Sequence, residues 1–135
     1  FGQAAMRAAE LRLASSAFES ALKLARELKD RQAEADVLLL QARLNVRQEK
    51  PRDAARGFER VREIYRSLGV TRNLAIATAD LGTVLLGLGE GAKGKTMLEE
   101  ASTLFEQIGM NGEADSCRSL IVAPSVLDSG PVGAR

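Results

Sequence analysis

One sixteen-residue pattern recurs along the chain and decides the fold. The stretch ARGFERVREIYRSLGV (55–70) has a counterpart forty residues before it, SSAFESALKLARELKD (15–30), and another forty residues after it, KTMLEEASTLFEQIGM (95–110). Six apolar or small columns agree in all three copies, with the spacing of one face of an α-helix. The columns are Ala14, Ala54, Gly94; Phe18, Phe58, Leu98; Ala21, Val61, Ala101; Leu24, Ile64, Leu104; Ala25, Tyr65, Phe105; and Leu28, Leu68, Ile108.

A second kind of helix is expected between the copies. DRQAEADVLLLQARLNV (30–46) and TRNLAIATADLGTVLLGL (71–88) share one place in the forty-residue frame, and FGQAAMRA (1–8) occupies that place before the first copy. We call these the A positions and the copies of the first pattern the B positions. Pro51 suits the first turn of a helix. Gly69 and Gly109 follow the last apolar position of a B helix, where a left-handed cap is usual.

The predicted fold is all-α. One A–B pair cannot bury its apolar face alone, so we expect the pairs to stack on a common core. The expected helical domain covers 1–122, with repeats at about 1–30, 31–70 and 71–110 and a terminal helix at 112–122. From residue 123 the periodicity is lost, and Pro, Gly and Ser predict a disordered tail or linker over 123–135. Because the chain opens with Phe1 in mid-pattern, we expect it to be a piece of a larger protein.

The composition excludes several kinds of site. The 135 residues include 19 basic and 18 acidic side chains, no histidine and one cysteine. Without histidine there is no Ser-His-Asp or Cys-His catalytic system of the usual kind and no His-ligated zinc. The near-neutral charge gives no reason to expect nucleic acid or a membrane as partner. Cys117 has no disulfide partner, which favours a reducing, cytoplasmic location. We expect no enzyme activity, cofactor or metal.

Residues of all three repeats match one known consensus: Leu81, Gly82, Leu85, Gly89, Gly94, Leu98 and Ala101; Ala42, Ala54, Phe58 and Val61; and Gly2, Ala14, Phe18 and Ala21. Through these residues the repeat resembles the tetratricopeptide repeats. Its period exceeds the usual ~34 residues of that family, and is similar to the long-helix variant of kinesin light chains and of bacterial maltose-activator-type regulators. The resemblance implies a right-handed superhelical stack of antiparallel helix pairs, an α-solenoid, that serves as a protein-interaction scaffold within a larger regulatory or assembly protein.

The resemblance also implies a peptide-binding groove on the A helices, on the side away from the B helices. Arginines there could form paired hydrogen bonds with carboxylates or phosphates. The expected partner is therefore another protein or peptide, acidic and with some apolar anchors. The same arginines could instead only keep the surface soluble or pair with an aspartate, and the sequence leaves both open. The expected groove residues are Met6, Arg7, Asp36, Leu39, Arg43, Arg47, Ile76, Thr83 and Leu86.

One stretch, GEGAKGKT (89–96), fits the phosphate-binding pattern G-x-x-x-x-G-K-[ST]. A phosphate loop follows a strand, whereas Thr78, Leu81 and Leu85 before this stretch have helical spacing. We therefore expect an A–B turn and the start of a helix. Three functions follow, in descending order: a peptide-binding scaffold, an architectural module that packs end to end or forms a homo-oligomer, and a nucleotide binder.

Overall fold

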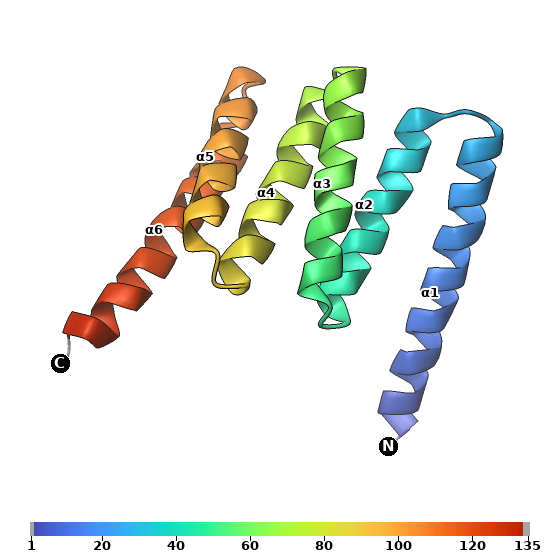
Figure 1. Ribbon diagram of the computed structural model, residues 1–135, viewed down its shortest axis with the longest axis horizontal. Helices are drawn as coiled ribbons and strands as arrows, with labels where there is room; N and C mark the ends of the chain where they lie inside the picture. Colours follow the sequence, from blue (N-terminus) through green and yellow to red (C-terminus); the bar gives the residue numbers. More distant parts are fainter. Residues whose placement is uncertain (1, 134–135) are drawn as a thin grey trace.

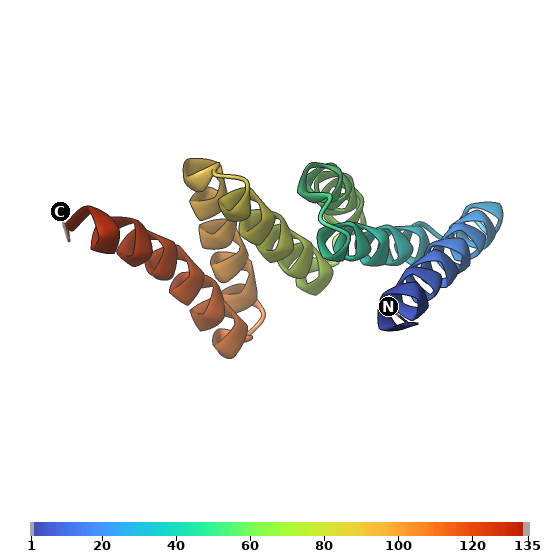
Figure 2. The same ribbon diagram turned by 90° about the horizontal axis from the view of Figure 1, so that it is seen from below.

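Helices account for nearly all of the described chain. The computed structural model describes the backbone of residues 2–133 and the side chains of residues 2–122. Within that range it contains helices and no strand, which confirms the all-α prediction. Each helix packs mainly against the helices before and after it in the sequence, in a zigzag row (Figures 1 and 2). The helices are α1 (Gly2–Glu27), α2 (Arg31–Arg47), α3 (Pro51–Leu68), α4 (Thr71–Gly87), α5 (Gly91–Gln107) and α6 (Asn111–Gly133).

The connections between helices are short and alike. In each, an amide donates back to the carbonyl five residues earlier, for example Val70 to Tyr65 at 3.2 Å and Glu90 to Leu85 at 2.9 Å. This is the Schellman arrangement, which requires one left-handed residue just after the helix. Gly69 and Gly109 take that conformation, with φ of 72° and 76°, so their predicted role as caps is confirmed. Pro51 stands in the first turn of α3, as predicted.

Helix α1 differs from the expected arrangement because it is continuous. Residues 2–8 were expected at an A position, before the first B helix, but they extend that B helix instead. The reason is visible in the repeat frame. Where the later repeats have Glu49-Lys50-Pro51 and Gly89-Glu90-Gly91, the first has Ala9, Glu10 and Leu11, all good helix formers. Nothing in the sequence ends the helix there.

The core consists of the repeated B columns and the A-helix residues that face them. In α3, Phe58, Val61 and Tyr65 are fully buried, and in α5 Leu98 and Ala101 are fully buried. These two helices each lie between two A helices, α3 between α2 and α4 and α5 between α4 and α6. Among the described helices, α1 packs mainly against α2, and three of its six column residues stay exposed: Ala21, Leu24 and Leu28.

Helices α4 and α5 approach each other most closely at two glycines. A Cβ on Gly82 would stand 2.8 Å from Leu98 Cγ and 3.0 Å from the Gly94 carbonyl oxygen. A Cβ on Gly94 would stand 2.9 Å from the Gly82 carbonyl oxygen and 2.9 Å from Leu86 Cδ2. Each backbone therefore occupies the space that the other residue's side chain would need, which explains the small-residue column at this place in the repeat.

The final helix runs past its predicted end. Helix α6 continues to Gly133, whereas the terminal helix was predicted to end at residue 122. The predicted disordered tail or linker covers residues 123–135. The side chains of these residues lie outside the described range, and so does the backbone of residues 134–135. That part of the domain division stays a prediction.

Candidate binding face on helices α2 and α4

Two A helices, α2 and α4, lie close enough to share one polar surface. Arg43 Nε on α2 donates to Asp80 Oδ2 on α4 at 2.8 Å. Further along the same helices, the Asn73 amide donates to Asp36 at 3.4 Å. We call the exposed and half-buried part of this surface the A-helix face. It comprises Asp36, Leu40, Arg43, Arg47, Asp80 and Thr83.

The Arg43–Asp80 pair fixes the centre of the A-helix face. Its side chains are 47% and 28% exposed, so the pair is open to solvent on one side. Burial raises the pKa of the Asp80 carboxyl above its usual value, and the hydrogen bond from Arg43 opposes that rise. The guanidinium of Arg43 binds Asp80 through Nε, which leaves its terminal nitrogens for another acceptor. Asp80 therefore positions Arg43 and leaves the terminal N–H donors of the Arg43 guanidinium available to a ligand.

At one end of the face, Asp36 is held by a buried tyrosine. The Tyr65 hydroxyl donates to Asp36, and Tyr65 is fully buried beneath it on α3. Burial raises the pKa of the Tyr65 hydroxyl well above its usual range, and the hydrogen bond to Asp36 raises it further. With Asn73 also donating to Asp36, this carboxylate links α2, α3 and α4. Asp36 therefore has a structural role in joining these helices. Its contact with a ligand remains a prediction.

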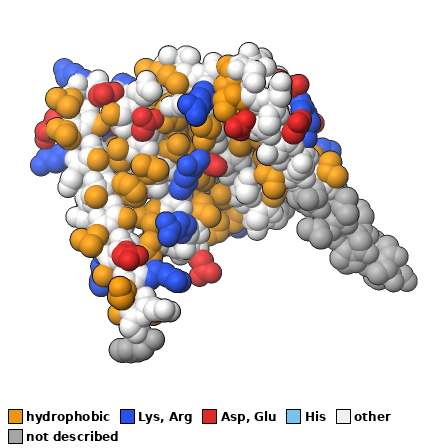
Figure 3. All heavy atoms as spheres, turned by 180° about the vertical axis from the view of Figure 1, so that it is seen from behind, with side chains coloured by type: hydrophobic (Ala, Val, Ile, Leu, Met, Phe, Trp, Pro, Cys, Tyr) orange, Lys and Arg blue, Asp and Glu red, His pale blue; other side chains and the backbone are white. Residues whose placement is uncertain are grey.

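At the other end, Arg47 is exposed in the last turn of α2. It has no ion-pair partner among the residues whose side chains the structure describes. It follows Arg43 by four residues and therefore lies on the same side of the helix. Seen from behind, Lys and Arg side chains form a column down the middle of the molecule, with acidic side chains beside it (Figure 3).

Three predicted groove residues serve mainly as packing residues. Leu39 is half-buried against the clusters that α2, α3 and α4 form. Ile76 and Leu86 are half-buried against the cluster around α5. The sequence prediction missed Leu40, which is 45% exposed and lies one turn before Arg43. Successive residues of a helix are rotated by about 100° about its axis. The prediction named Leu39, which packs against the core, whereas the surface residue at this place is its neighbour Leu40.

Of the three remaining predicted residues, two do not join the others on an A helix. Met6 and Arg7 lie in the first turns of α1, in the part that extends the first B helix, and both are exposed. Thr83 lies on α4 as expected and is exposed, but its hydroxyl donates to the Ala79 carbonyl at 2.9 Å. Asp36, Arg43 and Arg47 thus share one side of α2, and Thr83 lies one turn after Asp80, the partner of Arg43, on α4.

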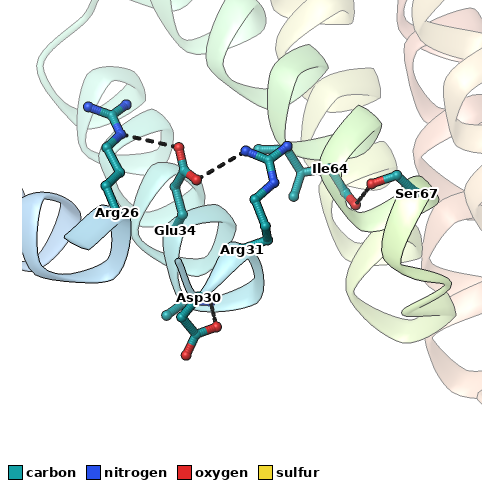
Figure 4. A network of polar contacts seen from close by, with 7 residues as sticks. Arg26, Asp30, Arg31, Glu34, Ile64 and Ser67 are labelled. Carbon is teal, nitrogen blue, oxygen red and sulfur yellow. Dashed lines mark hydrogen bonds and ion pairs between the residues drawn. The ribbon is translucent and has the colours of Figure 1, made fainter. Parts of the chain in front are cut away.

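Other charged side chains tie helices together. The Glu34 carboxylate is nearly buried and receives hydrogen bonds from Arg26 of α1 at 3.2 Å and Arg31 of α2 at 3.1 Å (Figure 4). Arg62 of α3 donates to the Thr78 hydroxyl of α4 at 2.9 Å and pairs with Glu100 of α5. Buried charges need such partners to offset their desolvation, so we assign these groups to the packing of the helices.

The GEGAKGKT stretch forms a turn and a helix start. Gly89 is the left-handed residue after α4, with φ of 82°, and α5 begins at Gly91. The preceding residues form helix α4, where a phosphate loop has a strand. Gly94 packs against Gly82, and Lys95 is an exposed residue on α5. The close packing of α4 on α5 therefore accounts for Gly94, the second glycine of the phosphate-loop pattern.

A cleft of about 490 Å³ lies on the other side of α4, between the B helices α3 and α5. Its walls carry charges of both signs, and its floor is formed by Leu81, Leu85 and Met97. Glu59 and Glu63 stand on one wall and Lys93 on the other. The mixed charges do not indicate one class of ligand.

Neither a metal site nor a membrane span is present in the described part of the chain. Among the described residues, no group of three or more Cys, Asp and Glu side chains could hold a metal ion. None of the described helices is both long and apolar enough to cross a bilayer. Cys117 is buried, and burial raises the pKa of its thiol, which makes it a poor nucleophile.

Comparison with known proteins assigns no family to the chain. No family model matches it, and a search of the curated proteins finds no significant match.

Proposed function

We propose that the chain is a non-catalytic protein-interaction scaffold that binds an acidic peptide or helix of a partner protein across the A-helix face. The observation that carries the proposal is the arrangement of cations and an apolar side chain on this face. Leu40, Arg43 and Arg47 lie on one side of α2, and Arg43 is held in place by Asp80. Such a surface offers an apolar contact and two guanidinium groups to one extended ligand.

The chemistry of these residues favours carboxylates as the groups recognised. A guanidinium binds a carboxylate through two parallel hydrogen bonds, and it loses little hydration in doing so. Because Arg43 is already positioned, less side-chain entropy is lost when a ligand binds it. Arg47 has no competing ion-pair partner among the described side chains, so a ligand carboxylate would not have to displace one. The resemblance to tetratricopeptide repeats favours the same face.

A peptide selection with charge-reversal controls tests this function. A displayed library of random twelve-residue peptides (roughly the span of one helix face) is selected on the 135-residue chain, and the enriched peptides are synthesised and titrated in a fluorescence-anisotropy assay. Arg47→Glu is expected to weaken binding at least about tenfold, or ~1.4 kcal/mol. Arg60→Glu, the same charge change at an exposed position of α3, is the matched control and should leave binding unchanged.

Two results would contradict the proposal. One is enrichment of peptides with no excess of Asp and Glu. The other is equal binding to the Arg47→Glu and Arg60→Glu variants, because the ligand would then lie elsewhere on the chain.

A further inference from the structure

The two ends of the A-helix face carry opposite charges that have no ion-pair partner in the fold. Asp36 stands at one end of α2 and Arg47 at the other, with Leu40 between them. Leu40, Arg43 and Arg47 follow Asp36 by four, seven and eleven positions. All three therefore lie within about 40° of it around the helix axis. Arg43 is paired with Asp80, but neither Asp36 nor Arg47 has an ion-pair partner among the residues whose side chains the structure describes.

The Asp36 carboxylate is held in place, and one of its oxygens is available to a ligand. Both of its hydrogen-bond donors, the hydroxyl of buried Tyr65 and the side-chain amide of Asn73 at 3.4 Å, bind Oδ1. Its Oδ2 accepts no hydrogen bond from the described residues, and the side chain is exposed. Because both donors are neutral groups, they do not compensate the negative charge. A cation of a ligand would therefore meet a positioned carboxylate and would not have to displace another cation.

We propose that the A-helix face binds an extended segment of mixed charge, in which a lysine or arginine pairs with Asp36 and aspartates or glutamates pair with Arg43 and Arg47. This inference rests on the proposed function and adds the order of the charges along the ligand. A uniformly acidic segment that covered the whole face would bring a carboxylate against Asp36, and like charges repel each other across an interface. Complementary charges also fix the register in which a ligand binds. Asp36 is therefore the residue that sets which end of the ligand lies where.

The spacing of these residues along α2 gives the spacing expected in the ligand. A helix advances about 1.5 Å per residue, so Arg43 lies about 10.5 Å and Arg47 about 16.5 Å beyond Asp36 along the axis. An extended chain advances about 3.3 Å per residue, so the ligand cation should lie about three residues from one carboxylate and about five from the other. A peptide of about twelve residues is only marginally stable as an isolated helix. The extended spacing is therefore the one expected in selected peptides.

Two parallel selections test the order of the charges. The random peptide library described above is selected on the wild-type chain and on the Asp36→Asn variant. Asparagine keeps an oxygen for Tyr65 and Asn73 and removes only the charge, so the variant should fold, as circular dichroism will show. Peptides from the wild-type selection should carry Lys or Arg about three to five residues from an acid, at least about threefold more often than peptides from the variant. The excess of Asp and Glu should persist in both selections.

A titration with a modified peptide locates the cation. In the tightest wild-type peptide, the basic residue at this spacing is replaced by norleucine, and both peptides are titrated in the fluorescence-anisotropy assay. The replacement should weaken binding to the wild-type chain about three- to fivefold, the effect of a partly exposed ion pair. It should leave binding to Asp36→Asn nearly unchanged. Glu19→Gln removes a negative charge from an exposed position of α1 and is the matched control, on which the replacement should cost as much as on the wild type.

Three outcomes would overturn the inference. Wild-type selection of acidic peptides that lack a basic residue at this spacing would refute the order of the charges and leave the proposed function standing. An equal loss from the norleucine replacement on the wild type and on Asp36→Asn would place the cation elsewhere, again without affecting the preference for acids. Peptides with no excess of Asp and Glu would overturn this inference together with the proposed function.

Discussion

Gly82→Ala tests the close approach of α4 and α5. The added methyl group would stand 2.8 Å from Leu98 Cγ and 3.0 Å from the Gly94 carbonyl oxygen. Leu98 is fully buried and the carbonyl belongs to the backbone, so neither can move aside as an exposed side chain would. Overpacking of this kind costs about 1–3 kcal/mol. Alanine in a helix interior regains about 0.5–1 kcal/mol relative to glycine. The net expectation is a loss of roughly 1–2 kcal/mol in the free energy of unfolding.

Gly87→Ala is the matched control because it adds the same methyl group to the same helix. Nothing lies within 4 Å of the position that its Cβ would take. It should leave the protein equally or more stable, by up to about 1 kcal/mol. The measurement is urea unfolding of the wild type and both variants, followed by far-ultraviolet circular dichroism. Equal or greater stability of Gly82→Ala relative to Gly87→Ala would refute the reasoning, because the two helices would then not meet at these glycines.

Four further predictions follow from the same structure. The folded state raises the pKa of Tyr65, so the unfolded chain loses the phenol proton at a lower pH than the folded protein. The free energy of unfolding should therefore not depend on this group below about pH 10, and should fall above that pH by up to ~1.4 kcal/mol per pH unit. Tyr65→Phe should remove this fall. Glu49→Gly should stabilise the chain by about 1 kcal/mol because Glu49 has a φ of 61°. Phe58→Ala should cost about 3–5 kcal/mol, and Phe18→Ala much less, because Phe58 is buried and Phe18 only half-buried. Lys95→Ala should leave melting in magnesium-ATP unchanged, since Lys95 is a surface residue of α5.

The controls for these predictions are direct. Tyr65 is the only tyrosine and the chain has no tryptophan, so absorbance of the ionised phenol reports its titration alone. A midpoint near pH 10 in the folded protein would contradict the described burial. Destabilisation by Glu49→Gly would contradict the left-handed turn, and an equal loss from both phenylalanine variants would contradict the one-sided packing of α1. A melting shift with magnesium-ATP that disappears in Lys95→Ala would restore the nucleotide interpretation of this stretch.

The B helices could be predicted from the sequence because their apolar columns repeat three times. Phe58, Val61 and Tyr65 recur in register with Leu98, Ala101 and Phe105, and all six are buried. The continuity of α1 was missed, although Ala9, Glu10 and Leu11 contain no residue that ends a helix. The repeat frame suggested a turn there, but local sequence decides whether a helix stops.

The A-helix face could be predicted only in part. Successive helix residues are about 100° apart, so an error of one residue exchanges Leu39 in the core for Leu40 on the surface. The pairing of Arg43 with Asp80 depends on how closely α2 and α4 lie, which is a tertiary distance that periodicity does not contain. Likewise, the hydrogen bond from Tyr65 to Asp36 joins residues from two helices. The sequence could identify these groups as candidates, but not the partners that they have in the fold.

The most direct test of the proposed scaffold is the location of a bound peptide. The tightest acidic peptide from the selection is titrated into the isotopically labelled chain, and backbone amide chemical shifts are followed by nuclear magnetic resonance. The account predicts that the largest shifts fall on α2 from Asp36 to Arg47 and on α4 around Asp80 and Thr83. Shifts confined to α3 and α5, around Glu59 and Lys93, would place the ligand in the opposite cleft and contradict the account.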